Sequence, residues 1–168
     1  PKAPVIEKIA FDLSAQGYAL CIVNTGGNHA DLNDDYASVP AEMKSVAKYF
    51  GCSVLREMSM EKLLSDIKGA REEVGDRAIL RAIHFFEDNK RVEKEAEALK
   101  NGDFDTFKAL TIASGYSSYM YNQNVFSSSA PLSQPVSLAL AISEVILKGK
   151  GAWRVHGGGF AGTIQAYV

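Results

Sequence analysis

Short stretches of alternating apolar and polar residues lie near both ends of the chain. Residues 8–13 and 18–23 are rich in apolar and β-prone residues and are separated by Ala15-Gln16-Gly17. This pattern predicts two strands joined as a hairpin. Residues 153–155 and 164–168 also alternate, with glycines between them, and predict two further strands connected by a glycine-rich loop.

The middle of the chain has the three- and four-residue periodicity of amphipathic helices. It predicts helices over residues 39–50, 59–64, 76–99, 104–115 and 136–146. Pro40 and Gly51 are expected to mark the first turn and the end of the first of these helices, and Ser59 to cap the second. Asn101-Gly102 followed by Asp103 predicts that one helix stops and the next starts, as in an antiparallel helix pair.

Composition bounds the size of the fold and the partners it can have. With 168 residues, 46% of them hydrophobic, the chain can bury a core as a single domain over residues 1–168. A net charge of -2 with no basic face disfavours nucleic acid and anionic membranes as partners.

Cysteine use and hydropathy indicate the compartment. Cys21 and Cys52 have neither disulfide nor metal-ligand spacing, no apolar run is long enough to span a membrane, and no signal peptide is visible. These features predict a cytoplasmic protein with free thiols. The chain begins without methionine at the linker-like residues 1–4, so we expect a piece of a longer protein.

The glycine-rich loop is the first candidate site. Gly157, Gly158 and Gly159 leave the backbone free to adopt positive φ and let a ligand approach the peptide amides closely. Successive N–H groups in such a turn can form a concave site for phosphate or carboxylate. The alternative is a glycine-rich hairpin that binds nothing.

A polar cluster precedes the first predicted helix. His29 with Asp31, Asp34 and Asp35 suggests a divalent-metal site or a general base. The alternative is a solvated loop that caps the helix. Tyr36 follows at the expected joint of loop and helix, where its ring could lie against a sugar or base while its hydroxyl donates a hydrogen bond.

Two other candidates favour structural interpretations. Ser127-Ser128-Ser129 resembles the serine-rich phosphate loops of some kinases, but it lacks the glycines that let a backbone wrap a phosphate. His84 lies among apolar residues of the longest predicted helix, which is typical of a structural histidine. Residues 114–133 are rich in serine, tyrosine and asparagine and suit a loop that lines a site.

Four motifs, in the same order, resemble the galactokinase family over about residue 18 to the end of the chain. They are His29, Leu32 and Tyr36 followed by Val46-Ala47 and Gly51; Arg81-Ala82 and His84 with Asn89 and Arg91; Gly102-Asp103-Phe104 within residues 99–107; and Gly157 to Gly162. The glycine loop alone is shared with the wider GHMP kinase superfamily, so the order of all four motifs carries the resemblance.

The resemblance implies an α+β, ferredoxin-like GHMP kinase C-terminal domain with an antiparallel sheet packed against helices. It implies transfer of the γ-phosphoryl group of ATP to a sugar hydroxyl, with galactose as the usual substrate. Tyr36 and Gly157, Gly158 and Gly159 would bind substrate at one shared rim. The chain would supply no catalytic residue and no metal ligand, because ATP and Mg2+ would be bound mainly by an absent N-terminal domain, the expected partner.

Two alternatives remain open at this point. A domain of this fold can serve as a catalytically inactive sugar or nucleotide sensor, or as an interaction domain whose glycines only form a turn. Val39 and Pro40 stand where the family often has paired arginines, His156 where it has threonine, and Ala161 where it has glycine. These departures leave the identity of the sugar open.

Overall fold

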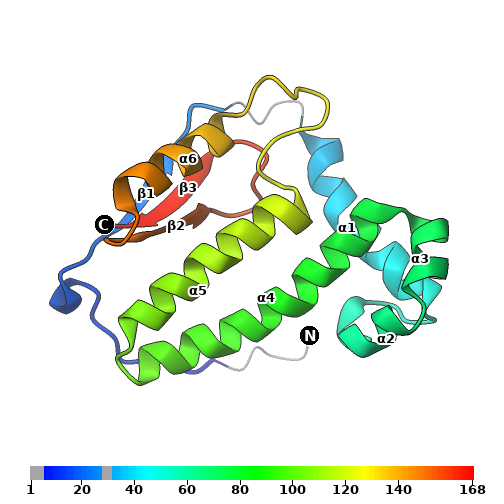
Figure 1. The fold of residues 1–168 in the computed structure, drawn as a ribbon, viewed down its shortest axis with the longest axis horizontal. Helices are drawn as coiled ribbons and strands as arrows, with labels where there is room; N and C mark the ends of the chain where they lie inside the picture. The colour runs from blue at the N-terminus through cyan, green and yellow to red at the C-terminus, as the bar shows by residue number, and fades with distance from the viewer. Residues whose placement is uncertain (1–5, 28–31) are drawn as a thin grey trace.

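The computed structural model describes residues 6–27 and 32–168 and shows helices arranged around a small antiparallel sheet (Figure 1). The α+β class is therefore confirmed. The helices are α1 (Asn33–Tyr49), α2 (Met60–Ser65), α3 (Ile67–Val74), α4 (Asp76–Lys100), α5 (Phe104–Ser117) and α6 (Pro135–Leu147). The strands are β1 (Leu20–Asn24), β2 (Ala152–Val155) and β3 (Thr163–Tyr167), and shorter turns are η1 (Ser14–Gln16), η2 (Leu55–Glu57) and the π-helical turn η3 (Ser118–Asn122).

The sheet joins the two ends of the chain. Its order is β1-β3-β2, and both neighbours of β3 run antiparallel to it. In register, Leu20 of β1 and Ala152 of β2 flank Tyr167 of β3. The last strand in sequence is therefore the middle strand in space.

Helices α5 and α6 both pack against the sheet, and Ile112 of α5 joins α6 in the apolar cluster on one face. On one face, Val155 and Ile164 are buried in a cluster with Leu140 of α6. On the other face, the ring of Phe107 of α5 lies 5.3 Å from that of Tyr167. Since successive strand residues point to opposite faces, this alternation of apolar residues lets β3 pack on both sides.

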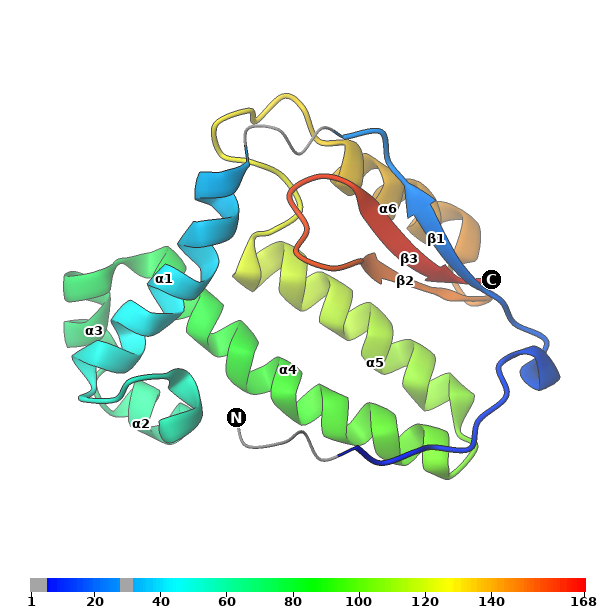
Figure 2. The ribbon, with the colours of Figure 1, turned by 180° about the vertical axis from the view of Figure 1, so that it is seen from behind.

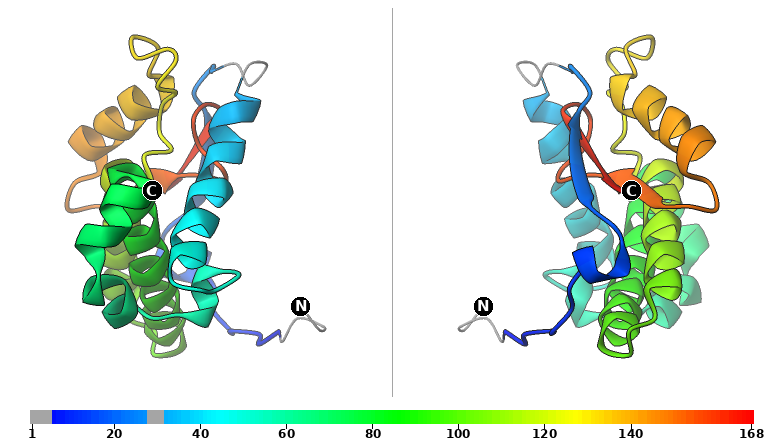
Figure 3. Two further views of the ribbon diagram at one scale, coloured as in Figure 1. Left: turned by 90° about the vertical axis from the view of Figure 1, so that its right-hand side faces the viewer. Right: turned by 90° about the vertical axis from the view of Figure 1, so that its left-hand side faces the viewer.

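β1 is the least covered strand. Leu20 and Ile22 are each 49% exposed and Val23 is 42% exposed. Figure 3 shows β1 at the edge of the sheet, and no strand in the described part of the chain pairs with its outer side. The apolar surface of β1 is therefore available for a further contact.

α4 and α5 form an antiparallel pair, as the sequence predicts (Figures 1 and 2). α4 ends before Gly102, whose φ of 69° suits glycine, and Asp103 then accepts a hydrogen bond from the amide of Thr106. The first half of α4 also buries Ala82 and Phe86 against α1 and the short helices. This long helix thus packs against α1 and the short helices near its start and against α5.

The predicted strand at residues 8–13 is wrong. These residues form no strand, and β1 pairs with the distant β3 instead of with a neighbouring strand. Asp12 accepts hydrogen bonds from the amide and hydroxyl of Ser14, which turns the chain, and Phe11 stacks on Phe104 at 5.5 Å. The apolar residue that suggested a strand is therefore satisfied by packing on α5.

The first helix begins six residues earlier than predicted. α1 starts at Asn33, so Pro40 lies inside the helix instead of in its first turn. Asp34, Asp35 and Tyr36, predicted as loop, belong to that first turn. Proline contributes no backbone N–H, yet the helix continues through it because Val46 and Ala47 are fully buried further along. The cap of α2 by Ser59 is confirmed.

Candidate functional site

The glycine loop connects β2 to β3. The amide of His156 donates to the carbonyl of Thr163 at 3.0 Å and closes the end of the ladder. Gly157 and Gly159 have φ of 68° and 81°, as expected for glycines at a tight turn, whereas Gly158 does not adopt positive φ. The conformational need for glycine therefore falls on the two outer positions.

Tyr36, in the first turn of α1, lies directly against this loop. Its hydroxyl donates to the carbonyl of Gly159 at 2.9 Å, and its ring meets that of Phe160 at 5.4 Å, nearly perpendicular. A Cβ on Gly158 would lie 2.7 Å from the Cε1 of Tyr36. The structure thus brings together the two groups that the sequence motifs place 121 to 123 residues apart.

Asn124 holds the same loop from the other side, and the sequence analysis did not single it out. Its side-chain amide donates to the carbonyl of Gly158 at 3.1 Å, and its backbone carbonyl accepts from the amide of Phe160 at 2.5 Å. A Cβ on Gly159 would lie only 1.9 Å from that carbonyl. The serine- and asparagine-rich composition of residues 114–133 signals a lining loop, but it does not identify which asparagine makes the contact.

The peptide amides of the loop are available to a ligand. Gly157 and Gly158 are exposed. Among the described residues, the amides of Gly157, Gly158 and Gly159 donate to no protein acceptor, whereas those of Phe160 and Ala161 are hydrogen bonded. Neighbouring amides of this kind can bind an anionic oxygen of phosphate or carboxylate.

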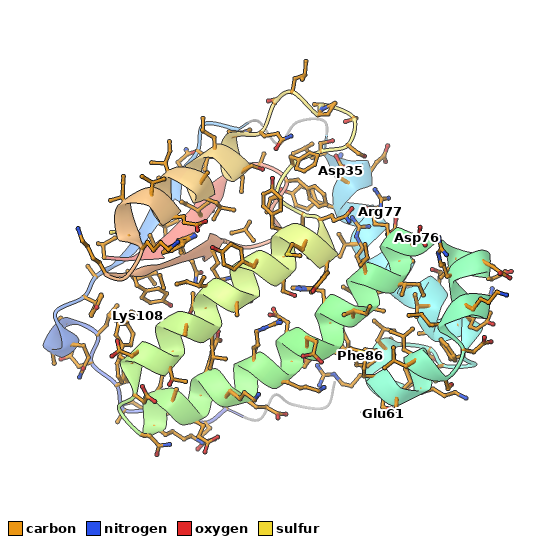
Figure 4. The ribbon with its side chains drawn as sticks, viewed as in Figure 1. Asp35, Glu61, Asp76, Arg77, Phe86 and Lys108 are labelled. Atoms are coloured by element: carbon orange, nitrogen blue, oxygen red, sulfur yellow. The ribbon has the colours of Figure 1, made fainter. Side chains whose placement is uncertain are left out.

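Tyr36 remains a neutral hydrogen-bond donor. Burial raises the pKa of its phenol, and the negative charge of Asp35 raises it further. Asp35 itself accepts a hydrogen bond from Ser127 at 2.5 Å, at the N-terminal end of α1 (Figure 4). Ser127, part of the serine run, therefore fastens the lining loop to α1.

The predicted metal cluster is only partly described. His29 and Asp31 lie outside the described residues. Asp34 and Asp35 lie in the first turn of α1, where the helix dipole stabilises negative charge. Within residues 6–27 and 32–168, no three histidine, cysteine or acidic side chains are grouped as metal ligands.

A buried arginine connects the elements that carry the site. Arg81 of α4 is 1% exposed; it donates to the hydroxyl of Ser38 at 2.9 Å and to the carbonyl of Asn122 at 3.0 Å. Its guanidinium also lies 2.8 Å from Glu42. Burial lowers the pKa of Arg81, and Glu42 opposes that shift. Arg81 thus joins α1, which carries Tyr36, to η3, which leads to Asn124.

His84 supports the structural interpretation. It is 8% exposed, and its Nδ1 lies 2.9 Å from the hydroxyl of Ser117 on α5. Burial lowers the pKa of the imidazole, which favours its neutral form. His84 therefore contributes to the packing of α4 on α5 through its contact with Ser117.

Hydropathy adds one further finding. Within the described residues, no helix combines the length and the apolar character that a membrane span requires.

Comparison with known proteins identifies relatives. This chain matches no protein-family model. It is 28% identical over 153 residues to the galactokinase of Glaesserella parasuis, 28% identical over 163 residues to that of Streptomyces coelicolor, and 30% identical over 158 residues to that of Homo sapiens. These alignments cover 91%, 96% and 94% of this chain, respectively.

The fold shows the same relationship. A crystal structure of Lactococcus lactis galactokinase complexed with galactose superposes with a TM-score of 0.70 and 25% identity, covering 90% of this chain and 37% of that one. The chain spans only 37% to 39% of the length of the curated relatives named above. This chain is therefore a homologue of the galactokinases over about nine tenths of its own length, with the extent expected of their C-terminal domain.

Proposed function

We propose that this chain is the C-terminal domain of a sugar kinase that transfers the γ-phosphoryl group of ATP to a hydroxyl of galactose. The observation that carries the proposal is the rim at which Tyr36 contacts Gly158 and Gly159, found in a homologue of galactokinases. The structural relative from Lactococcus lactis is described as complexed with galactose.

The rim suits the demands of phosphoryl transfer. This reaction requires positioning and charge stabilisation more than covalent chemistry by the protein. The exposed amides of Gly157 and Gly158 can receive an anionic oxygen, and the aromatic ring of Tyr36 can shape the adjoining surface for a sugar. Tyr36 also fixes the loop through Gly159, so that its hydroxyl orients the amides.

The remaining parts of the reaction are assigned to the other domain. We infer that an N-terminal domain binds most of the ATP and the Mg2+ and supplies the residues that act on the sugar hydroxyl. In the described part of this chain, the loop has no carboxylate or lysine hydrogen bonded to it that could take that role. The free thiols of Cys21 and Cys52 agree with a proposed cytoplasmic setting.

The test is ADP release by the full-length polypeptide that contains these residues, measured with ATP, Mg2+ and a panel of hexoses. We expect turnover with galactose, lost when Mg2+ is chelated. Turnover with another hexose but not with galactose would show that the substrate is that other hexose. Saturable galactose binding without ADP release would replace the kinase by a sugar sensor, and absence of both would overturn the proposal.

A further inference from the structure

A cavity lies away from the glycine loop, between α5 and α6 beside β2. Its volume is about 270 Å³. Ile112 and Tyr116 of α5, Leu140 of α6 and Trp153 of β2 form its walls, and Tyr119 of η3 lies at its mouth. None of the residues of the Tyr36 and glycine-loop rim lines it.

The walls are aromatic and apolar. Trp153 is 5% exposed, whereas Tyr116 and Tyr119 are 45% and 41% exposed and partly open to solvent. Such rings bury the apolar body of a small ligand and attract a cation through their negative faces. The cavity is large enough for a single aromatic ring with a short side arm.

The wall also carries polar groups that can accept hydrogen bonds. Glu144 of α6 and Tyr116 of α5 both line the cavity, and burial together with Glu144 raises the pKa of the Tyr116 phenol. Among the residues that the structure describes, no basic side chain pairs with Glu144. The hydroxyl of Ser137 is shielded from solvent and has no hydrogen-bond partner. A ligand that brings a donor or a positive charge would satisfy this wall.

We propose that this cavity binds a small primary amine with an aromatic body, with the ring against Trp153 and the ammonium group at Glu144. An anion of the same shape is disfavoured because the carboxylate of Glu144 would repel it. A neutral analogue would bury the same apolar area but would lack the charge-assisted hydrogen bond. The site is independent of the proposed sugar-kinase function.

The chain carries its own reporter for this test. Trp153 is the single tryptophan of the sequence and forms part of the wall. Its emission is followed while the chain is titrated with phenethylamine, with neutral 2-phenylethanol and with anionic 3-phenylpropionate, none of which absorbs at a tryptophan-selective wavelength. We expect phenethylamine to bind about tenfold more tightly than 2-phenylethanol, and 3-phenylpropionate most weakly.

The variant Glu144→Gln should weaken phenethylamine about tenfold and leave 2-phenylethanol unchanged. Glu72→Gln, which changes an exposed carboxylate on α3, is the matched control and should alter neither affinity. Amide chemical-shift changes provide a second readout and should cluster on α5, α6 and β2.

Several outcomes would contradict the proposed amine site. Equal affinities of the three probes, an unchanged preference in Glu144→Gln, or shifts clustered elsewhere would each overturn the proposal, as would an absence of binding. None of these measurements depends on sugar phosphorylation, so failure of the kinase proposal leaves them unaffected.

Discussion

The three consecutive glycines have different surroundings although they are adjacent in sequence. Gly157 has positive φ and open space around it, Gly158 faces the ring of Tyr36, and Gly159 has both positive φ and a backbone carbonyl of Asn124 in the way. If all three positions needed only a flexible backbone, their surroundings would not differ in this way. The position that tolerates a side chain least is therefore Gly159.

We predict that Gly159→Ala lowers the free energy of unfolding by about 3 kcal/mol or more, because positive φ and overpacking add. Gly157→Ala is the matched control and should cost only about 1–2 kcal/mol, because it meets the backbone penalty alone. Urea denaturation of both variants measures the difference. Equal losses would contradict the close approach of Asn124 to Gly159.

Tyr36 contributes a ring and a hydroxyl whose effects can be separated. Tyr36→Phe keeps the ring at Gly158 but removes the hydrogen bond to Gly159, and should lower stability by about 1 kcal/mol. Tyr36→Ala removes both, so in the full-length protein it should raise the KM for galactose or lower kcat more than Tyr36→Phe does. Steady-state kinetics of the two variants measure these changes. An unchanged KM and kcat for Tyr36→Ala would show that Tyr36 is not part of the site.

At the scale of elements, local signals predicted helices well. The turn from α4 to α5 follows from Asn101-Gly102-Asp103, and α2 follows from its Ser59 cap, since each signal acts within a few residues. The partner of β1 could not be predicted in this way, because it lies more than 130 residues away. The pattern at residues 8–13 misled for the same reason, since its apolar side chain packs on a distant helix.

The candidate site shows the same division. The sequence motifs, by resemblance, placed Tyr36 and the glycine loop together, and the structure confirms that contact. Asn124 and the anchoring role of Arg81 were not predicted, because both act through backbone carbonyls far along the chain. Periodicity carries no information on such contacts. Substrate binding by the rim stays a prediction.

Arg81 ties α1, α4 and η3 together, and its loss should be costly. Arg81→Leu leaves the carbonyl of Asn122 without this donor and should lower stability by about 3 kcal/mol. Arg71→Ala is the control: Arg71 pairs with Asp76 on the surface, and its removal should cost less than about 1 kcal/mol. Guanidinium denaturation compares the two. A small effect at Arg81 would show that the anchor is dispensable.

His84 should make the packing of α4 on α5 sensitive to acid. Burial lowers its pKa below the usual 6.5; Asp88 opposes the shift, and Arg154 and Arg91 reinforce it. The unfolded chain therefore binds the proton more readily, so this contribution to stability is complete above about pH 6.5 and is lost as pH falls toward the folded-state pKa.

The variant His84→Gln should therefore lose less stability than the parent between neutral pH and about pH 5. Burial raises the pKa of Glu95, which acts in the opposite direction but is present in both proteins. Chemical denaturation across this range gives the two slopes, with His156→Gln, at an exposed residue, measured alongside. Parallel slopes for the parent and His84→Gln would contradict the mechanism.

At the scale of the whole molecule, we propose that the rim of Tyr36 and the glycine loop is one side of a site that another domain completes. The chain matches only 37% of the chain of its structural relative, and the apolar residues of β1 are partly exposed. We therefore predict that these 168 residues alone release no ADP from ATP in the presence of galactose and Mg2+. A coupled assay with the full-length polypeptide as positive control tests this, and measurable turnover by the fragment would contradict the division of labour proposed above.

The central position of β3 has a consequence for biosynthesis. β1 emerges from the ribosome before the other described strands, but its pairing partner, Thr163–Tyr167, is translated after every other described element. The helices between them can form as they emerge, whereas β1 must wait with apolar residues unprotected. A polypeptide truncated before Thr163 would leave β1 and β2 with no common neighbour, and such a product would be a target for chaperones or proteases.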